Sequence, residues 1–254
     1  MKLIIAEYLR SLKERDELDR LLPDLLVEMG YVPVARPQTG NRQYGVDIAV
    51  RGRDSESSLD ELILVVVKQG DIGRTEWDGG NQSVRQSINE IFDVYLKSHL
   101  EPQDQSRSIR IVVATNGERK QTVQASWSGF VSDNKSKAHI EFWGADFIAN
   151  LIEKHLLDEH IFLDEDRHDL RRALALSGDS QYDRQDLYRL FRRALDLNDK
   201  GQLTDKPKTN RALLKALRIV NLSAQMFAHW TLRDDGDARQ GLFAVERAML
   251  WTWH

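Results

Sequence analysis

Two largely apolar runs constrain the fold of this 254-residue chain more than any other feature. Residues 62–67 read LILVVV, and residues 109–114 read IRIVVA. Short runs that are rich in β-branched residues and bounded by turn-forming residues are typical of strands buried on both faces. Such strands lie inside layered α/β domains, so the two runs predict a sheet with helices on both sides.

The sequence around these runs predicts the remaining elements of the domain. Further strands are expected at residues 31–35, 45–50 and 139–143, and further helices at 82–96 and 145–157. An amphipathic helix is expected before the sheet, with Asp16 as its N-cap, Gly30 as its stop and a start or kink set by Pro23. Its apolar positions recur at helical spacing: Leu18, Leu21, Leu22, Leu25, Leu26 and Met29. This order describes an α/β domain, a mixed sheet flanked by helices.

The character of the chain changes near residue 159, beyond which no strand signal is found. Helices are expected at residues 164–176, 183–197, 210–230 and 235–251, separated by polar breaks. We therefore divide the chain into an α/β domain at residues 1–157 and an all-helical region for assembly or linkage at residues 158–254.

Composition limits the classes of site that the chain can form. There is no cysteine, which excludes disulfides and cysteine-based zinc sites. The apolar patch at the N-terminus is too short for a signal peptide or a membrane span, so we expect a cytoplasmic protein without a membrane partner. The formal net charge of −4 gives no general support for binding nucleic acid, which would need a local basic surface or a metal ion.

Arginines are frequent in the helical half, but acidic residues lie between them. Such interspersed charges predict a solvated helix surface rather than a phosphate-binding face. The arginines concerned are Arg167, Arg171, Arg172, Arg184, Arg189, Arg192 and Arg193.

Asp47 and Lys68 are the residues on which a chemical function depends. Each lies on or at the end of an expected strand, so two neighbouring strands could bring them together at one edge of the sheet. A carboxylate there can hold a hard divalent cation, which activates a water and neutralises charge on a phosphate. The lysine can orient the attacking water and stabilise the transition state. Together they are the minimum set for phosphodiester hydrolysis.

An ordered series of motifs surrounds this pair: VEMGY, GVDI, VVVK, NQSVRQSINEI and EFWGADFIANLI. With this order and spacing, residues 16–157 resemble the PD-(D/E)XK, restriction-endonuclease-like superfamily, in particular its Mrr type. The resemblance implies a restriction-endonuclease-like fold, with Asp47 as a metal ligand and Lys68 as the catalytic lysine. It also implies a Mg²⁺- or Mn²⁺-dependent endonuclease that cuts double-stranded DNA in a restriction or anti-phage defence system.

The chain departs from the family pattern at Val66, where an acid or amide is expected two residues before the lysine. A valine cannot bind a metal, so another acid must complete an active site. Asp71, shortly after Lys68, is the first candidate for a catalytic and metal-binding role, and Glu90 on the following helix is the second.

The resemblance implies several further site residues. The family often carries an additional acid in its first helix, and alignment to Gly30 places it at Glu17, with Asp19 as the runner-up. Gln82 and Gln86 match a helix that contacts the substrate backbone or the metal site in relatives. Arg42 and Arg74, in nearby loops, are further candidates for contact with DNA.

A second interpretation comes from Val66 and the net negative charge. The domain could keep the nuclease fold without catalysis and serve as a module for DNA binding or protein assembly. Because cutting both strands usually needs two active sites, a homo-oligomer or a larger defence complex is the expected assembly of an active enzyme.

Overall fold

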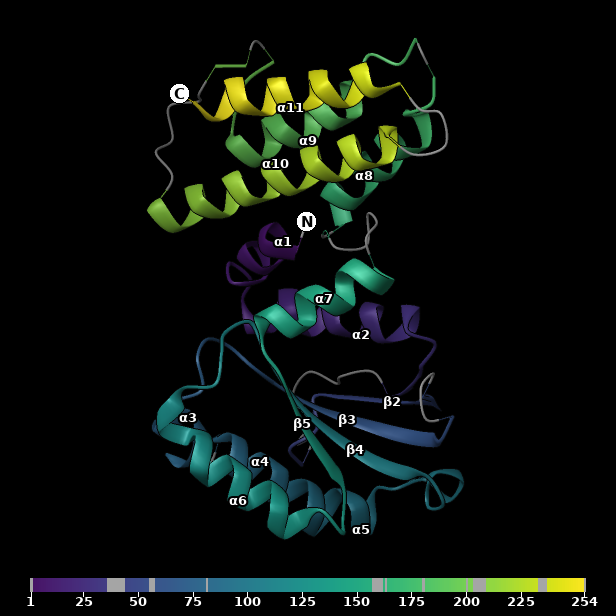
Figure 1. The fold of residues 1–254 in the computed structure, drawn as a ribbon, viewed down its shortest axis with the longest axis vertical. Coiled ribbons are helices and arrows are strands. Elements are labelled where there is room, and N and C mark those ends of the chain that lie inside the picture. The colour runs from purple at the N-terminus through teal and green to yellow at the C-terminus, as the bar shows by residue number, and fades with distance from the viewer. Residues whose placement is uncertain are drawn as a thin grey trace. The chain divides into compact units, whose positions relative to one another are not determined.

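The computed structural model describes residues 2–35, 44–54, 58–80, 82–156, 162, 164–179, 181–199, 201–202, 209–232 and 237–253 (Figure 1). The chain divides into two compact units, residues 12–151 and residues 1–11 with 152–254. The division expected at 157/158 thus falls at 151/152. The first eleven residues group with the helical unit, because helix α1 (Lys2–Leu9) packs against helix α10 (Asn210–Thr231).

Residues 12–151 contain a mixed five-stranded sheet with its strands in sequence order. The strands are β1 (Val32–Ala35), β2 (Ile48–Arg53), β3 (Asp60–Lys68), β4 (Ser108–Thr115) and β5 (His139–Trp143). The first three strands pair antiparallel, whereas β3, β4 and β5 pair parallel. The predicted α/β class and the positions of the strands are confirmed.

Helices cover both faces of this sheet (Figure 1). On one face lie α2 (Asp19–Glu28) and α7 (Ala145–His155). On the other lie α3 (Arg74–Asp78), α4 (Val84–Glu90) and α6 (Gln124–Asn134). The helix that begins as α4 continues through η2 (Ile91–Tyr95) into α5 (Leu96–Ser98), close to the expected 82–96. Every residue of β3 from Glu61 to Val67 is buried, as expected for a strand covered on both faces.

The first helix of the sheet domain starts at Asp19 and not directly after Asp16, the expected N-cap. A later start was the alternative that Pro23 left open, and Pro23 lies inside the helix. The preceding segment η1 (Glu14–Leu18) is irregular, with Asp16 at φ 65°. Since this conformation interrupts a right-handed helix, Glu14 and Glu17 lie on a separate turn beside β3.

Helix α6, between β4 and β5, was not among the expected elements. A parallel pair of strands requires a crossover connection, and α6 supplies it. Trp127 of α6 packs against Trp77 of α3 and Phe142 of β5, with ring centroids 5.5 and 5.8 Å apart. Short turns η3 (Pro102–Asp104) and η4 (Gln121–Val123) precede β4 and α6, respectively.

Gly45 allows the chain before β2 to approach helix α4. It has φ 82°, a left-handed conformation that favours glycine. A Cβ atom there would lie 2.1 Å from the carbonyl oxygen of Ser87, which is backbone and cannot rotate away. The position therefore requires glycine, and it sets the path of the chain two residues before Asp47.

We expect Gly45→Ala to destabilise the sheet domain by roughly 2–4 kcal/mol, because it combines a left-handed backbone with a clash against Ser87. Gly129→Ala is the matched control. Gly129 lies inside α6 with open space where its Cβ would be, so alanine should stabilise the protein by about 0.5–1 kcal/mol. Urea unfolding of both variants checks this, and an unchanged midpoint for Gly45→Ala would contradict it.

The second unit is helical. Besides α1 and α10 it contains α8 (Asp164–Leu176), α9 (Gln185–Leu195) and α11 (Ala238–Thr252), close to the four expected helices. Glu7 of α1 accepts a hydrogen bond from Arg218 of α10 at 2.7 Å, and Tyr8 packs against Phe162. No helix in the described part of the chain is both long and apolar enough to cross a bilayer.

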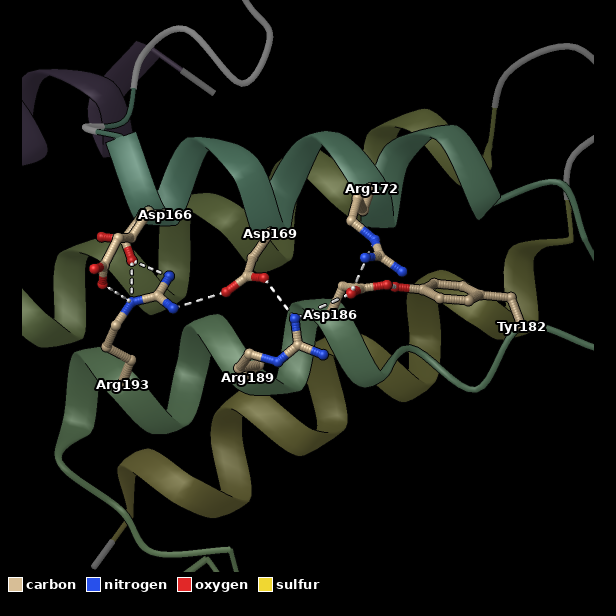
Figure 2. A network of polar contacts seen from close by, with 8 residues as sticks. Asp166, Asp169, Arg172, Tyr182, Asp186, Arg189 and Arg193 are labelled. Carbon is tan, nitrogen blue, oxygen red and sulfur yellow. Dashed lines mark hydrogen bonds and ion pairs between the residues drawn. The ribbon is translucent and has the colours of Figure 1, made fainter.

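A charged network joins α8 to α9 (Figure 2). The carboxylate of Asp169, which is 4% exposed, accepts hydrogen bonds from Arg189 at 2.9 Å and Arg193 at 2.8 Å. Asp186 is equally buried and contacts Arg172, Arg189 and the hydroxyl of Tyr182. The expected solvated surface is therefore wrong for this part of the helices, where both carboxylates are buried and several arginines are engaged by them.

Loss of the Asp169 charge should weaken the helical unit. Asp169→Asn removes the negative charge and replaces one accepting oxygen with an NH2 donor that faces an arginine, and we expect it to cost roughly 1–3 kcal/mol. The two arginines are partly exposed, which keeps the figure below that of a fully buried ion pair. Chemical unfolding followed by circular dichroism measures the change, and wild-type stability in this variant would show that the network contributes little.

Candidate active site

Asp47 is fixed against the end of strand β3. It directly precedes β2, and its backbone N–H donates to the carbonyl of Val65 at 2.8 Å. Its side-chain Oδ2 accepts a hydrogen bond from the backbone N–H of Val67 at 2.7 Å. Lys68, the last residue of β3, is half-buried next to this contact. The structure thus brings together the two residues on which the sequence-based prediction rests.

The surroundings of Asp47 are electrostatically unfavourable for its negative charge. Burial is the largest effect and raises the pKa of Asp47, while the Val67 N–H and the charge of Lys68 oppose that rise. Glu14 and Asp19 lie near enough to raise the pKa further. The charges of Glu14, Asp19 and Lys68 thus all act on the Asp47 carboxylate at the end of β3.

Asp19 has an oxygen atom without a hydrogen-bond donor. Its Oδ1 is buried and, among the residues that the structure describes, accepts no hydrogen bond. Burial raises the pKa of Asp19 and the neighbouring Asp16 adds to the rise, whereas hydrogen bonds from backbone groups of residues 16, 19 and 20 oppose it. A buried carboxylate oxygen that lacks a partner is costly, and a cation or a proton would stabilise it.

The two candidates in the first helix differ in what they contact. Glu17, the first choice from the sequence, accepts a hydrogen bond from the backbone N–H of Lys13 at 2.7 Å. Asp19, the runner-up, is the one whose charge acts on Asp47. Among the predicted residues, Asp19 therefore fits a role beside Asp47 better than Glu17 does.

Asn116 joins this segment to the loop after β3. It is buried, its Oδ1 accepts from the backbone N–H of Gly70 at 2.7 Å, and its Nδ2 donates to the carbonyl of Leu12 at 2.7 Å. The hydroxyl of Thr115 donates to the carbonyl of Gly70 at 2.6 Å. Sequence reasoning missed Thr115 and Asn116, although both directly follow the predicted buried strand at the same edge as Lys68.

Val66 lies inside the hydrophobic core and cannot serve the site. It is fully buried among apolar side chains, which include Leu64 and Ile88. At this position the structure therefore offers no metal ligand where the family pattern has an acid or amide.

The two acids expected to replace that ligand lie in other surroundings. Asp71 is about half exposed; its Oδ1 accepts from the backbone N–H of Glu118 at 3.0 Å, and its Oδ2 lies 3.9 Å from the Nζ of Lys120. Glu90 is the last residue of α4 and is partly buried. Neither is among the charges that act most strongly on Asp47. Their metal-binding role stays a prediction without support from these contacts.

The predicted DNA-contacting residues lie on exposed segments. Gln86 is exposed on α4, Gln82 lies just before that helix, and Arg74 is the first residue of α3. Arg42 lies outside the described residues. Trp77, between them in the sequence, is buried in the core against Trp127.

Within the described ranges, no group of three or more acidic, histidine or cysteine side chains is arranged to hold a metal ion. The residues present offer Asp47 and Asp19 as oxygen donors. That set is small, but Mg²⁺ is commonly held by one or two carboxylates together with waters and substrate phosphates. The donor chemistry therefore fits a hard divalent cation.

Comparison with protein-family models, with curated proteins and with solved structures finds no match to this chain.

A buried carboxylate whose pKa is raised destabilises the fold when it is ionised. The folded pKa of Asp47 lies above its unfolded value, so its contribution to stability is lost as the pH rises through the folded pKa. Asp47→Asn removes the charge and keeps an acceptor for the Val67 N–H. We expect this variant to be more stable than the wild type at pH 7, by roughly 0.5–2 kcal/mol.

Unfolding measured across pH 3–8 checks this expectation. The difference between the two proteins should shrink as acid protonates Asp47. Asp71→Asn, on an exposed carboxylate of a neighbouring loop, is the control and should show no comparable gain. A less stable Asp47→Asn at neutral pH would mean that the ionised carboxylate contributes to the fold.

Proposed function

We propose that residues 12–151 form a restriction-endonuclease-like domain of the PD-(D/E)XK, Mrr type that hydrolyses phosphodiester bonds in double-stranded DNA with Mg²⁺ or Mn²⁺. One observation carries the proposal. The Asp47 carboxylate is clamped to the end of β3 by the Val67 N–H, beside Lys68 and within electrostatic reach of Asp19. Lys68 is the last residue of β3 and Asp47 directly precedes β2, so the sheet anchors the backbone of both residues.

Each residue has a role in this proposal. Asp47 and Asp19 bind the cation, with Asp19 in place of the acid that Val66 replaces. A bound divalent cation supplies an activated water and neutralises charge on the phosphate. Lys68 orients the attacking water and stabilises negative charge that develops during the reaction. Asn116 positions the site, because it ties the segment before Asp19 to the loop after Lys68.

The unfavourable electrostatics of the site support a functional interpretation. Burial and neighbouring acids raise the pKa values of both Asp47 and Asp19, and such shifts are frequent at functional sites. A divalent cation would reduce the repulsion and bind the Asp19 oxygen that accepts no hydrogen bond from the described residues. A role in restriction or anti-phage defence, and a homo-oligomeric or larger assembly, rest on the family resemblance alone.

A second function is favoured by two observations. Val66 removes one expected ligand, and no metal-holding group of three is present in the described part of the chain. These features suit a catalytically inactive nuclease-fold module that binds DNA or assembles with other proteins. The nuclease would need Lys68 and the carboxylates to cut DNA, whereas the inactive module would cut no DNA with or without them.

Cleavage of plasmid DNA with Mg²⁺ or Mn²⁺ separates the two functions. We expect the full-length protein to cut, and Asp47→Ala, Asp19→Asn and Lys68→Ala each to reduce the rate by at least about 100-fold. Asp71→Asn is the matched control, since that carboxylate contacts Glu118 and Lys120, and it should retain activity.

Each other result has a defined meaning. If Asp71→Asn loses activity and Asp19→Asn keeps it, then Asp71 rather than Asp19 is the second metal ligand. Wild-type activity in Lys68→Ala would refute the proposed site. A protein that binds duplex DNA but never cuts it, with all variants alike, would support the inactive module.

A further inference from the structure

Arg119 is a cation held by aromatic rings. It lies in the loop after β4, and the centre of its guanidinium group is 5.0 Å from the ring centroid of Trp127 and 5.3 Å from that of Phe142. Stacking of this kind fixes the orientation of a guanidinium group without neutralising its charge. The group is therefore preorganised but still positive.

The hydrogen-bonding capacity of Arg119 is not used within the described part of the protein. Its Nε is buried and finds no acceptor there, and no carboxylate among the described residues forms an ion pair with it. Burial lowers the pKa of Arg119, as expected for a cation that has lost solvent without gaining an anion. Arg110 provides the contrast, because its guanidinium group, which also has a buried Nε without a partner, forms an ion pair with Glu61 at 2.9 Å.

The acids nearest to Arg119 in sequence are directed elsewhere. Glu118 accepts a hydrogen bond from the backbone N–H of Asp146 at 3.3 Å. Asp71, in the facing loop, accepts from the backbone N–H of Glu118 and lies near Lys120. Since the side chain of Arg119 is partly exposed, an anion from solvent can reach it.

Arg119 lies at the same edge of the sheet as Lys68. Lys68 of β3 is opposite Thr115 of β4, and four residues further along both chains Ile72 forms a parallel bridge with Arg119. Four residues span at most about 13 Å. Phosphates of one DNA strand follow at about 3.4 Å along the helix axis, so Arg119 is within about four nucleotides of a phosphate at Lys68.

We propose that Arg119 contacts a backbone phosphate of duplex DNA next to the bond that is cut. Arginine is suited to this role because its planar fork matches the oxygens of a phosphate. The proposal rests on the proposed nuclease function for the identity of the ligand. Arg119 would supply local positive charge for binding DNA in a chain whose formal net charge is −4.

A binding experiment in the absence of metal tests this inference separately from catalysis. Full-length protein is titrated into a fluorescent 20-base-pair DNA duplex with EDTA, at several salt concentrations. Arg119→Gln should weaken binding about 5–10-fold and reduce the salt dependence by about one phosphate contact. Arg119→Lys keeps the charge but not the planar guanidinium group, so its affinity for DNA should lie between those of the wild type and Arg119→Gln.

Arg53→Gln is the control with the same change in charge. Arg53 pairs with Asp60 at the opposite end of the β2–β3 hairpin and should bind DNA like the wild type. Equal affinity and salt slope for Arg119→Gln and the wild type would overturn the inference, and so would a wild type that does not bind the duplex. A lower melting temperature with an unchanged salt slope would likewise overturn it, in favour of a purely structural arginine.

The outcome is distinguishable from that of the proposed nuclease. A wild type that binds, loses one contact in Arg119→Gln and never cuts with Mg²⁺ would support the phosphate contact and refute the nuclease. A wild type that cuts DNA, together with an Arg119→Gln variant that binds DNA as tightly as the wild type, would support the nuclease and refute the phosphate contact.

Discussion

Strand β3 is the constraint on which the sheet domain depends. It pairs antiparallel with β2 and parallel with β4, and both of its faces are covered by helices. Its backbone is therefore held on every side, and the residue at its end has little freedom. Lys68 occupies that end, and the Val67 N–H beside it holds the carboxylate of Asp47. The same pairing that makes the core stable places the candidate catalytic groups side by side.

The candidate site combines this rigidity with electrostatic cost. Asp47 and Asp19 are carboxylates in surroundings that disfavour their charge, and one oxygen of Asp19 has no donor in the described structure. Under the proposed function, a bound cation and a substrate phosphate would offset this electrostatic cost beside Lys68.

The strands and most helices could be predicted from the sequence, because apolar runs and helical spacing report burial directly. Helix α6 could not, since Trp127 and Phe130 are its main apolar contacts and Gly129 and several serines weaken its pattern. The place of α1 also escaped prediction, because it depends on long-range contacts such as that of Glu7 with Arg218.

The pair Asp47 and Lys68 was predictable because each ends or begins a strand. The choice of Asp19 over Glu17 was not, since it follows from the irregular turn at Asp16, which no spacing rule describes. Asn116 and Arg119 contact loops and rings that are distant in sequence, so these contacts are visible only in three dimensions.

The location of the cation is the most direct test of this account. Crystals of the full-length protein soaked in Mn²⁺ would locate the metal by its anomalous scattering. The account predicts a single peak within coordination distance of the Asp47 and Asp19 carboxylates, beside Lys68. A peak at Asp71 or Glu90 instead, or no peak near Asp47 at saturating Mn²⁺, would contradict it.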